Sequence, residues 1–247
     1  MNHHKRLSVL AAAAALTCSL GVSTHALAQE GEGMPPADPQ TAPAAQTEEE
    51  SDVPGWFRMD ADSLGLQFWA GATHSLGGVD IATDIYVVGS NGEFDIGPAL
   101  SFGDLTLTPM VGVNFDFAGQ RVNPLIAPQL FTIYAGDPIY FESWIQFFIA
   151  DGVFHSQGEP NAAYTRNFLL FKLGRDVSVG PQIEATIGLN DAAKPNDKAL
   201  TSMPVGGAVS LAYGKGSTLL MFLGYETVEE AQVEDKITGR FTWIYTF

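Results

Sequence analysis

The amino-acid sequence predicts an all-β fold, a transmembrane up-and-down antiparallel β-barrel of about 12 strands, with 10 strands as the alternative. Three observations predict it: apolar residues recur at every second position, the alternating runs reach 10 to 14 residues, and short and long connections follow one another along the chain. Strands of soluble proteins are usually about 5–6 residues long, whereas a tilted strand that crosses a bilayer needs about 9–11. The length of the runs therefore favours a barrel in a membrane over a soluble sandwich, which also alternates.

Composition and charge exclude two other classes of protein. Hydrophobic residues make up 46% of the 247 residues, which is too apolar for a disordered chain, and charged residues make up only 16%. The formal net charge of −16 argues against a nucleic-acid partner, since such proteins need a basic surface to neutralise phosphates. The length fits one all-β domain.

The chain divides into three segments. Residues 1–28 have a basic start, an apolar run and the small residues Ala26 and Ala28, which predict a cleaved signal peptide and hence export. Residues 29–53 form a Pro-, Ala- and Glu-rich stretch that predicts a disordered periplasmic linker, because such a composition buries nothing. Residues 54–247 are the predicted barrel.

Three runs show the alternation most regularly. Odd positions are apolar in 105–117 and 177–190, and even positions are apolar in 94–103. Their other face is mostly small or polar, which is typical of strands with lipid on one side and a lumen on the other.

The connections between runs support the same fold. Tight links fall at 103–104, 135–138, 174–176 and 214–216, and generally longer ones at about 89–93, 118–123, 151–163, 191–202 and 227–235. Outer-membrane barrels alternate short periplasmic turns with longer outer loops in this way. Eleven runs are recognisable, an odd number, so either Trp56–Asp60 belongs to a twelfth strand or Leu64–Thr73 lies outside the wall.

The last run carries aromatic residues on one face and ends on an aromatic. These residues are Phe241, Trp243, Tyr245 and Phe247. With the signal sequence and the strand rhythm, this end resembles bacterial outer-membrane β-barrels, whose final strand is the insertion signal read by the barrel-assembly machinery. The resemblance covers most of the chain after the signal peptide and implies a Gram-negative outer membrane. It also implies contact with outer-membrane lipids and lipopolysaccharide, and a homo-oligomer stays open. The edge strand of a secreted sandwich is the alternative.

Charged residues on the predicted inner face are candidates for lining a pore. They are Asp116, Glu142, Arg166, Lys172, Glu184 and Arg240. A three-residue turn at 174–176 sets Arg166 opposite Glu184, so we expect a salt bridge between them inside the lumen. Opposed charges could sort ions by their field, or could simply neutralise each other and stiffen the wall.

Aromatic residues also point inward in this phase. The candidates are Trp69, Tyr140, Trp144 and Phe168, which could line a site for an apolar or sugar-like ligand or could fill the lumen. No cofactor or metal is expected, because His74 and His155 have no zinc-like spacing and no triad pattern accompanies them. Glu229, Glu230, Glu234 and Asp235 form an acidic stretch that could bind divalent cations, although a solvated loop explains it as well.

The sequence therefore predicts a channel and not an enzyme. We expect passive passage of small solutes or ions with a weak cation preference, because acidic residues outnumber basic ones 21 to 10 in 54–247. The alternative is a closed barrel with structural or surface-interaction duties that uses its outer loops. A lipid-modifying enzyme or an apolar-ligand-binding barrel comes third.

Overall fold

A computed structural model describes residues 53–149, 161–189, 200–229, 231 and 236–247, and the statements below refer to these residues. The predicted signal peptide lies outside the described residues, as does the linker except for Val53. Glu230, Glu234, Asp235, His155 and most of the predicted loops at 151–163 and 191–202 are likewise outside them.

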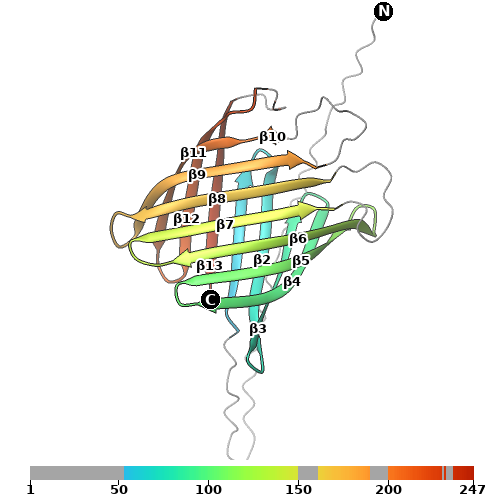
Figure 1. The fold of residues 1–247 in the computed structure, drawn as a ribbon, viewed down its shortest axis with the longest axis horizontal. Helices are drawn as coiled ribbons and strands as arrows, with labels where there is room; N and C mark the ends of the chain where they lie inside the picture. Colours follow the sequence, from blue (N-terminus) through green and yellow to red (C-terminus); the bar gives the residue numbers. More distant parts are fainter. Residues whose placement is uncertain (1–52, 150–160, 190–199, 230, 232–235) are drawn as a thin grey trace, which may run out of the picture. The chain divides into compact units, whose positions relative to one another are not determined.

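Twelve antiparallel strands close into a barrel (Figure 1). Each strand pairs with the next along the chain, and the last pairs with the first through contacts such as Trp56 opposite Thr246. The strands are β1 (Gly55–Asp62), β2 (Gly65–Leu76), β3 (Val79–Val88), β4 (Asn91–Phe102), β5 (Leu105–Asp116), β6 (Arg121–Ala135), β7 (Ile139–Phe148), β8 (Ala162–Lys172), β9 (Val177–Gly188), β11 (Pro204–Tyr213), β12 (Ser217–Glu226) and β13 (Ile237–Thr246). No helix in the described ranges is long and apolar enough to cross a membrane.

A thirteenth short strand, β10 (Leu200–Ser202), extends β11 and adds no strand to the wall. Ser202 lies opposite Thr186 in the register that sets Val205 opposite Ile183, and only Leu200 is shifted. The wall therefore has twelve strands, which confirms the prediction. The residues that complete the count are those of β1, so Trp56–Asp60 does belong to a strand.

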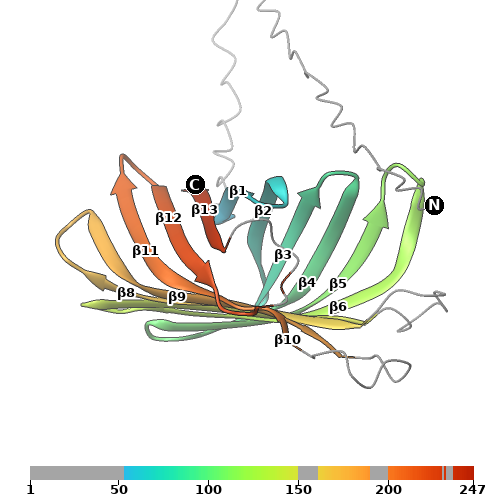
Figure 2. The ribbon, with the colours of Figure 1, turned by 90° about the horizontal axis from the view of Figure 1, so that it is seen from above.

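The two ends of the barrel differ in their connections. At one end all the links between strands are tight, and the two-residue turn at Gly103 and Asp104 follows the prediction, with Gly103 at φ 63°. Only glycine adopts this left-handed conformation at little cost. At the same end, Phe247 and Gly55 form two backbone hydrogen bonds with each other, and the N···O distances are 2.9 and 3.0 Å. We call the end of the barrel with these tight links the short-turn end. Figure 2 shows the curved wall of strands from above.

The opposite end carries the longer connections, but not uniformly. Residues 149–161, 189–199 and 227–236 connect strands there, as the sequence indicates. The turns after β1 and β3, however, contain only two residues each, 63–64 and 89–90. The expected alternation of short and long links therefore holds for only part of this end.

The outer face is apolar and exposed along the wall. Phe94 and Ile96 on β4 are 42% and 45% exposed, and Val111 on β5 is 45% exposed. Exposed aromatic side chains gather where strands reach the short-turn end: Phe102, Tyr134, Phe171, Tyr213, Tyr245 and Phe247. An apolar band with an aromatic girdle is the outer surface that a bilayer requires.

Candidate functional site: the lumen

The inner face of β1 supplies charges that the sequence analysis did not assign. Arg58 and Asp60 point into the barrel and are 5% and 3% exposed. Arg58 Nε donates to Asp60 Oδ2 at 3.0 Å, and its Nη1 lies 3.5 Å from Glu142 Oε1 on β7. Because β1 and β7 are six strands apart in a twelve-stranded ring, this contact crosses the lumen.

Arg166 on β8 joins the same cluster. Its Nη2 lies 3.1 Å from Glu142 Oε1 and its Nη1 lies 3.8 Å from Asp60 Oδ2, while Tyr140 donates its hydroxyl to Glu142 at 3.0 Å. Arg166 is only 1% exposed. Two arginines and two carboxylates therefore balance one another in a buried part of the lumen. We call Arg58, Asp60, Glu142 and Arg166 the central quartet.

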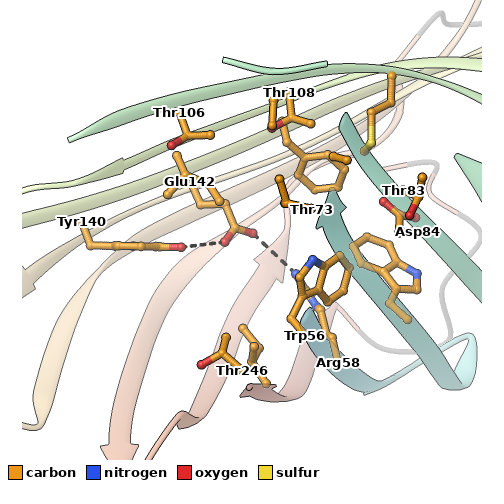
Figure 3. A pocket seen from close by; sticks show the side chains of 17 residues that line it. Trp56, Arg58, Thr73, Thr83, Asp84, Thr106, Thr108, Tyr140, Glu142 and Thr246 are labelled. Atoms are coloured by element: carbon orange, nitrogen blue, oxygen red, sulfur yellow. Dashed lines mark hydrogen bonds and ion pairs between the residues drawn. The ribbon is translucent and has the colours of Figure 1, made fainter. Parts of the chain in front are cut away.

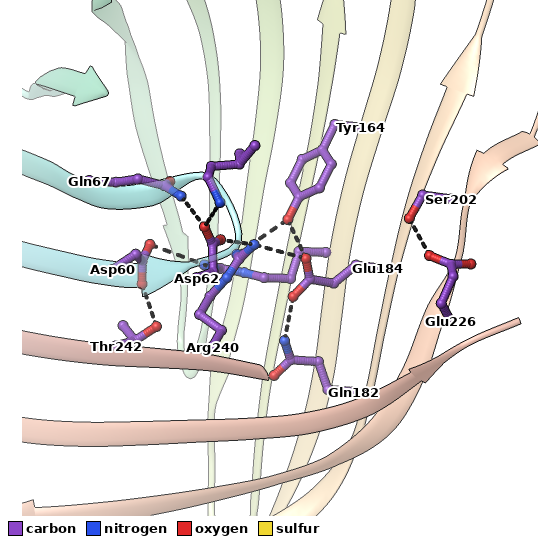
Figure 4. A network of polar contacts seen from close by, with 12 residues as sticks. Asp60, Asp62, Gln67, Tyr164, Gln182, Glu184, Ser202, Glu226, Arg240 and Thr242 are labelled. Atoms are coloured by element: carbon purple, nitrogen blue, oxygen red, sulfur yellow. Dashed lines mark hydrogen bonds and ion pairs between the residues drawn. The ribbon is translucent and has the colours of Figure 1, made fainter. Parts of the chain in front are cut away.

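A second ion cluster surrounds Arg240 on β13 (Figure 4). Its Nη2 lies 2.7 Å from Asp62 Oδ2 and 3.0 Å from Glu184 Oε2. Glu184 also accepts hydrogen bonds from the Tyr164 hydroxyl at 2.8 Å and from Gln182 Nε2 at 2.7 Å. This cluster again joins strands from different sides of the barrel.

The predicted salt bridge between Arg166 and Glu184 does not form, although the strand register predicted for these two residues is correct. Arg166 lies opposite Glu184 on neighbouring strands, as the turn predicts. Arg166 nevertheless pairs with Glu142 and Asp60, and Glu184 pairs with Arg240. Arg166 thus pairs with Glu142 on its other neighbouring strand, β7, and with Asp60 on β1, while Arg240 on β13 takes Glu184.

Two of the six predicted pore-lining charges lie away from these clusters. Asp116 is at the end of β5, where it pairs with the exposed Arg121 at 3.3 Å. Lys172 is at the short-turn end of β8, 3.6 Å from Asp137. Glu142, Arg166, Glu184 and Arg240 are thus the ones that the fold brings together.

Aromatic rings cross the lumen beside the central quartet. The Trp69 ring on β2 meets the Trp144 ring on β7 edge to face at 4.7 Å, and Phe131 stacks on Trp144 at 5.4 Å. Trp69 and Trp144 are 5% and 8% exposed, and the guanidinium of Arg58 lies over the Trp69 ring at 4.9 Å. We call Trp69, Phe131 and Trp144 the aromatic septum.

The other two predicted lumen aromatics form a separate stack. Tyr140 and Phe168 have ring centroids 5.9 Å apart, and Phe168 packs with Leu170, Ala208 and Leu220. They fill one side of the interior and do not form part of the septum.

An acidic cluster on β3 and β4 was missed in the sequence. Asp84, Glu93 and Asp95 are 8%, 3% and 1% exposed, and Asp84 lies opposite Asp95 in the register of β3 and β4. Gln129 donates to Asp95, and Gln146 Nε2 donates to Glu93 at 2.5 Å. Three carboxyl side chains therefore share one part of the inner face and are held by amide groups from β6 and β7.

A cavity of about 360 Å³ occupies the lumen between the septum and the short-turn end (Figure 3). Its walls combine aromatic rings (Trp56, Trp69, Phe131 and Tyr140), threonines from four strands (Thr73, Thr83, Thr106, Thr108 and Thr246) and three ionisable residues (Arg58, Asp84 and Glu142). This volume lies in the range of small-molecule sites, about 300–1,000 Å³.

A metal site is not found among the described residues. They contain no group of three or more His, Cys, Asp or Glu side chains that could hold a metal ion. His74, the one histidine among them, is exposed, and its Nε2 lies 3.1 Å from Thr83 Oγ1.

Comparison with known proteins adds the fold class. No protein-family model matches the chain, and no curated protein matches it. A membrane protein from work on in-meso crystallization shares 12% identity over 78% of this chain and 83% of its own, with a TM-score of 0.50. This likeness supports the fold alone, a closed antiparallel β-barrel. The NanC porin (10% identity, 78% of this chain, 98% of that chain, TM-score 0.49) and the KdgM porin (9%, 79%, 99%, 0.46) are also similar to this chain.

Proposed function

We propose that this porin-like barrel lies in the bacterial outer membrane and lets small solutes or ions pass by diffusion, with a preference for cations. The apolar outer band and the charged inner face support a membrane channel. By analogy with outer-membrane barrels, the short-turn end faces the periplasm.

The observation that carries the cation preference is the unequal charge on the two sides of the lumen. The central quartet is balanced, and Arg240 is matched by Asp62 and Glu184. The acidic cluster, by contrast, has no basic partner among the described residues. A ring or wall of carboxylates favours cations in a pore.

A closed barrel is the second candidate, and the cross-lumen contacts favour it. Trp69 meets Trp144, Arg58 meets Glu142, and Arg166 is 1% exposed. Any path at this height must therefore be narrow or must open by side-chain movement. We expect small unitary conductance if the barrel conducts.

Current through planar bilayers under a salt gradient tests the proposal. Unitary steps with a cation-selective reversal potential would support it. Glu184→Gln should then lower the cation selectivity and Arg166→Gln should raise it, whereas Asp176→Asn in an exposed turn should leave it unchanged. A fully inserted barrel that passes no current would favour the closed barrel.

A further inference from the structure

Polar side chains gather on three neighbouring strands of the outer face, β6, β7 and β8 (Figure 1). Arg166 is buried in the lumen, so Asn167, the next residue along β8, faces outward, and Thr165 does the same. The same alternation turns Ser143 on β7 outward, and Thr132 lies opposite it on β6. We call Thr132, Ser143, Thr165 and Asn167 the outer polar patch.

The position of Asn167 on its strand makes the patch costly in a lipid bilayer. Asn167 is the sixth of the eleven residues of β8. Outward positions in the middle of β4, β5, β12 and β13 carry exposed apolar side chains, such as Phe94, Val111, Met221 and Phe241. Hydrocarbon offers an amide no hydrogen bond, so an amide at this position costs free energy that an apolar side chain does not. A polar partner would offset that cost.

Hydrogen bonds inside the patch use half of what the Asn167 amide offers. Its Nδ2 donates to Thr165 Oγ1 at 2.9 Å, and its Oδ1 accepts a hydrogen bond from Ser143 Oγ at 2.6 Å. A primary amide can donate two hydrogen bonds and accept two. Among the described residues, one N–H and one acceptor site of Asn167 are therefore left for a partner.

A groove of about 170 Å³ lies beside the patch, on the side of β9. Asn167 lines it together with apolar residues of four strands: Phe141, Leu169, Pro181, Ile183 and Val205. Pro181 on β9 lies opposite Gly207 on β11, and neither side chain extends far from the sheet, so the outer face is low there. Lipid chains could fill this groove, but they would leave the amide without a partner.

We propose that this face binds a second copy of the chain, with Asn167 of each copy at the centre of the contact. Two copies inserted by the same route have the same orientation and depth in the membrane. A two-fold axis perpendicular to the membrane therefore brings each residue near the axis to its own counterpart at the same height. An amide suits this position because it both donates and accepts, so two Asn167 side chains can form two reciprocal hydrogen bonds.

The same axis makes the apolar surroundings of Asn167 complementary. A two-fold rotation places the β9 side of each copy against the β7 side of the other. The groove of one copy then faces the strand of its partner that carries the exposed Ile145 and Phe147, which are 36% and 42% exposed. The proposed contact does not depend on whether the lumen conducts, so it can fail while the channel proposal stands.

Sedimentation equilibrium of the refolded full chain in density-matched detergent micelles measures its mass and its association constant. We expect a monomer–dimer equilibrium that shifts toward the dimer as the ratio of protein to detergent rises. A monomer at every ratio, or a trimer, would overturn the proposal. Asn167→Leu keeps the size of the side chain and removes the amide, so it should weaken dimerisation about tenfold.

Two further variants test the groove. Gly207→Phe fills the low part of the outer face, where a Cβ has no neighbour nearer than 3.9 Å, and should also weaken dimerisation. Ala70→Phe adds the same ring to the exposed outer face of β2, six strands away from β8, and should leave dimerisation unchanged. Wild-type association in both Asn167→Leu and Gly207→Phe would overturn the assignment of this face. If Asn167→Leu does not fold, as judged by its heat-modifiable mobility, the comparison of Gly207→Phe with Ala70→Phe still decides.

Discussion

Glu142→Gln tests whether the middle of the lumen is dry. The Glu142 carboxylate, 6% exposed, is shared by Arg58 and Arg166, with N–O distances of 3.5 and 3.1 Å. The amide keeps the size of the side chain and its hydrogen bond with Tyr140, but it removes the charge. Two buried arginines are then left with Asp60 alone.

The expected loss follows from these distances. At an effective dielectric constant of about 20, each contact between unit charges at 3–3.5 Å contributes about 5 kcal/mol before the desolvation of the carboxylate is subtracted. Removing one partner of a buried ion pair costs about 3–5 kcal/mol in measured cases. We therefore expect Glu142→Gln to lower the free energy of unfolding by about 3–5 kcal/mol.

Urea unfolding in lipid vesicles, followed by tryptophan fluorescence, measures this change. Asp176→Asn is the control, because its carboxylate is 63% exposed and its ion pair with Arg175 spans 3.8 Å, so no measurable loss is expected. Arg58→Met added to Glu142→Gln restores the charge balance and should recover part of the loss. A loss below about 1 kcal/mol for Glu142→Gln would refute the reasoning, since it would mean that water screens the quartet.

Three further predictions concern packing, passage and assembly. Gly180→Ala should abolish refolding, because its Cβ would collide with the Leu169 carbonyl oxygen, whereas Gly207→Ala, whose Cβ has no neighbour nearer than 3.9 Å, should refold normally; equal refolding yields would contradict this. Trp144→Ala removes a ring of the septum and should speed solute entry in a liposome-swelling assay, and an unchanged rate would place the constriction elsewhere. Phe247→Ala removes a ring that is 71% exposed and keeps the backbone hydrogen bonds with Gly55. It should slow insertion by purified assembly machinery without lowering stability in urea, and equal insertion rates would argue against a terminal signal.

The alternation of apolar residues at every second position predicted where the strands lie and which face of the wall each side chain occupies. Met110 and Gly112 on β5 are buried and Val111 between them is exposed, as the alternation requires. The same phase on β4 turns Glu93 and Asp95 inward, so the acidic cluster could have been found from the sequence. β1 was harder to recognise, because Trp56 and Phe57 are adjacent aromatics on opposite faces and hide its alternation.

Contacts across the lumen could not be predicted from the sequence. The alternation indicates which face a side chain occupies. The turn length indicates which residue lies opposite it on the next strand, as with Arg166 and Glu184. Neither the alternation nor the turn length indicates which side chain on the opposite wall lies at the same height along the barrel axis. The pairing of Arg58 with Glu142 depends on strand tilt and barrel width, which emerge only when the ring closes.

Closure between β1 and β13 has a consequence for how the protein reaches its membrane. Joining the two ends of the barrel segment carries a loop-closure entropy of about 5 kcal/mol, and contacts so distant in sequence form slowly. Until they form, both edge strands present unpaired N–H and C=O groups, each of which costs several kcal/mol in hydrocarbon. The strands therefore cannot enter the bilayer one at a time. A catalyst that holds both free edges until they meet would remove the step that most exposes the chain to aggregation.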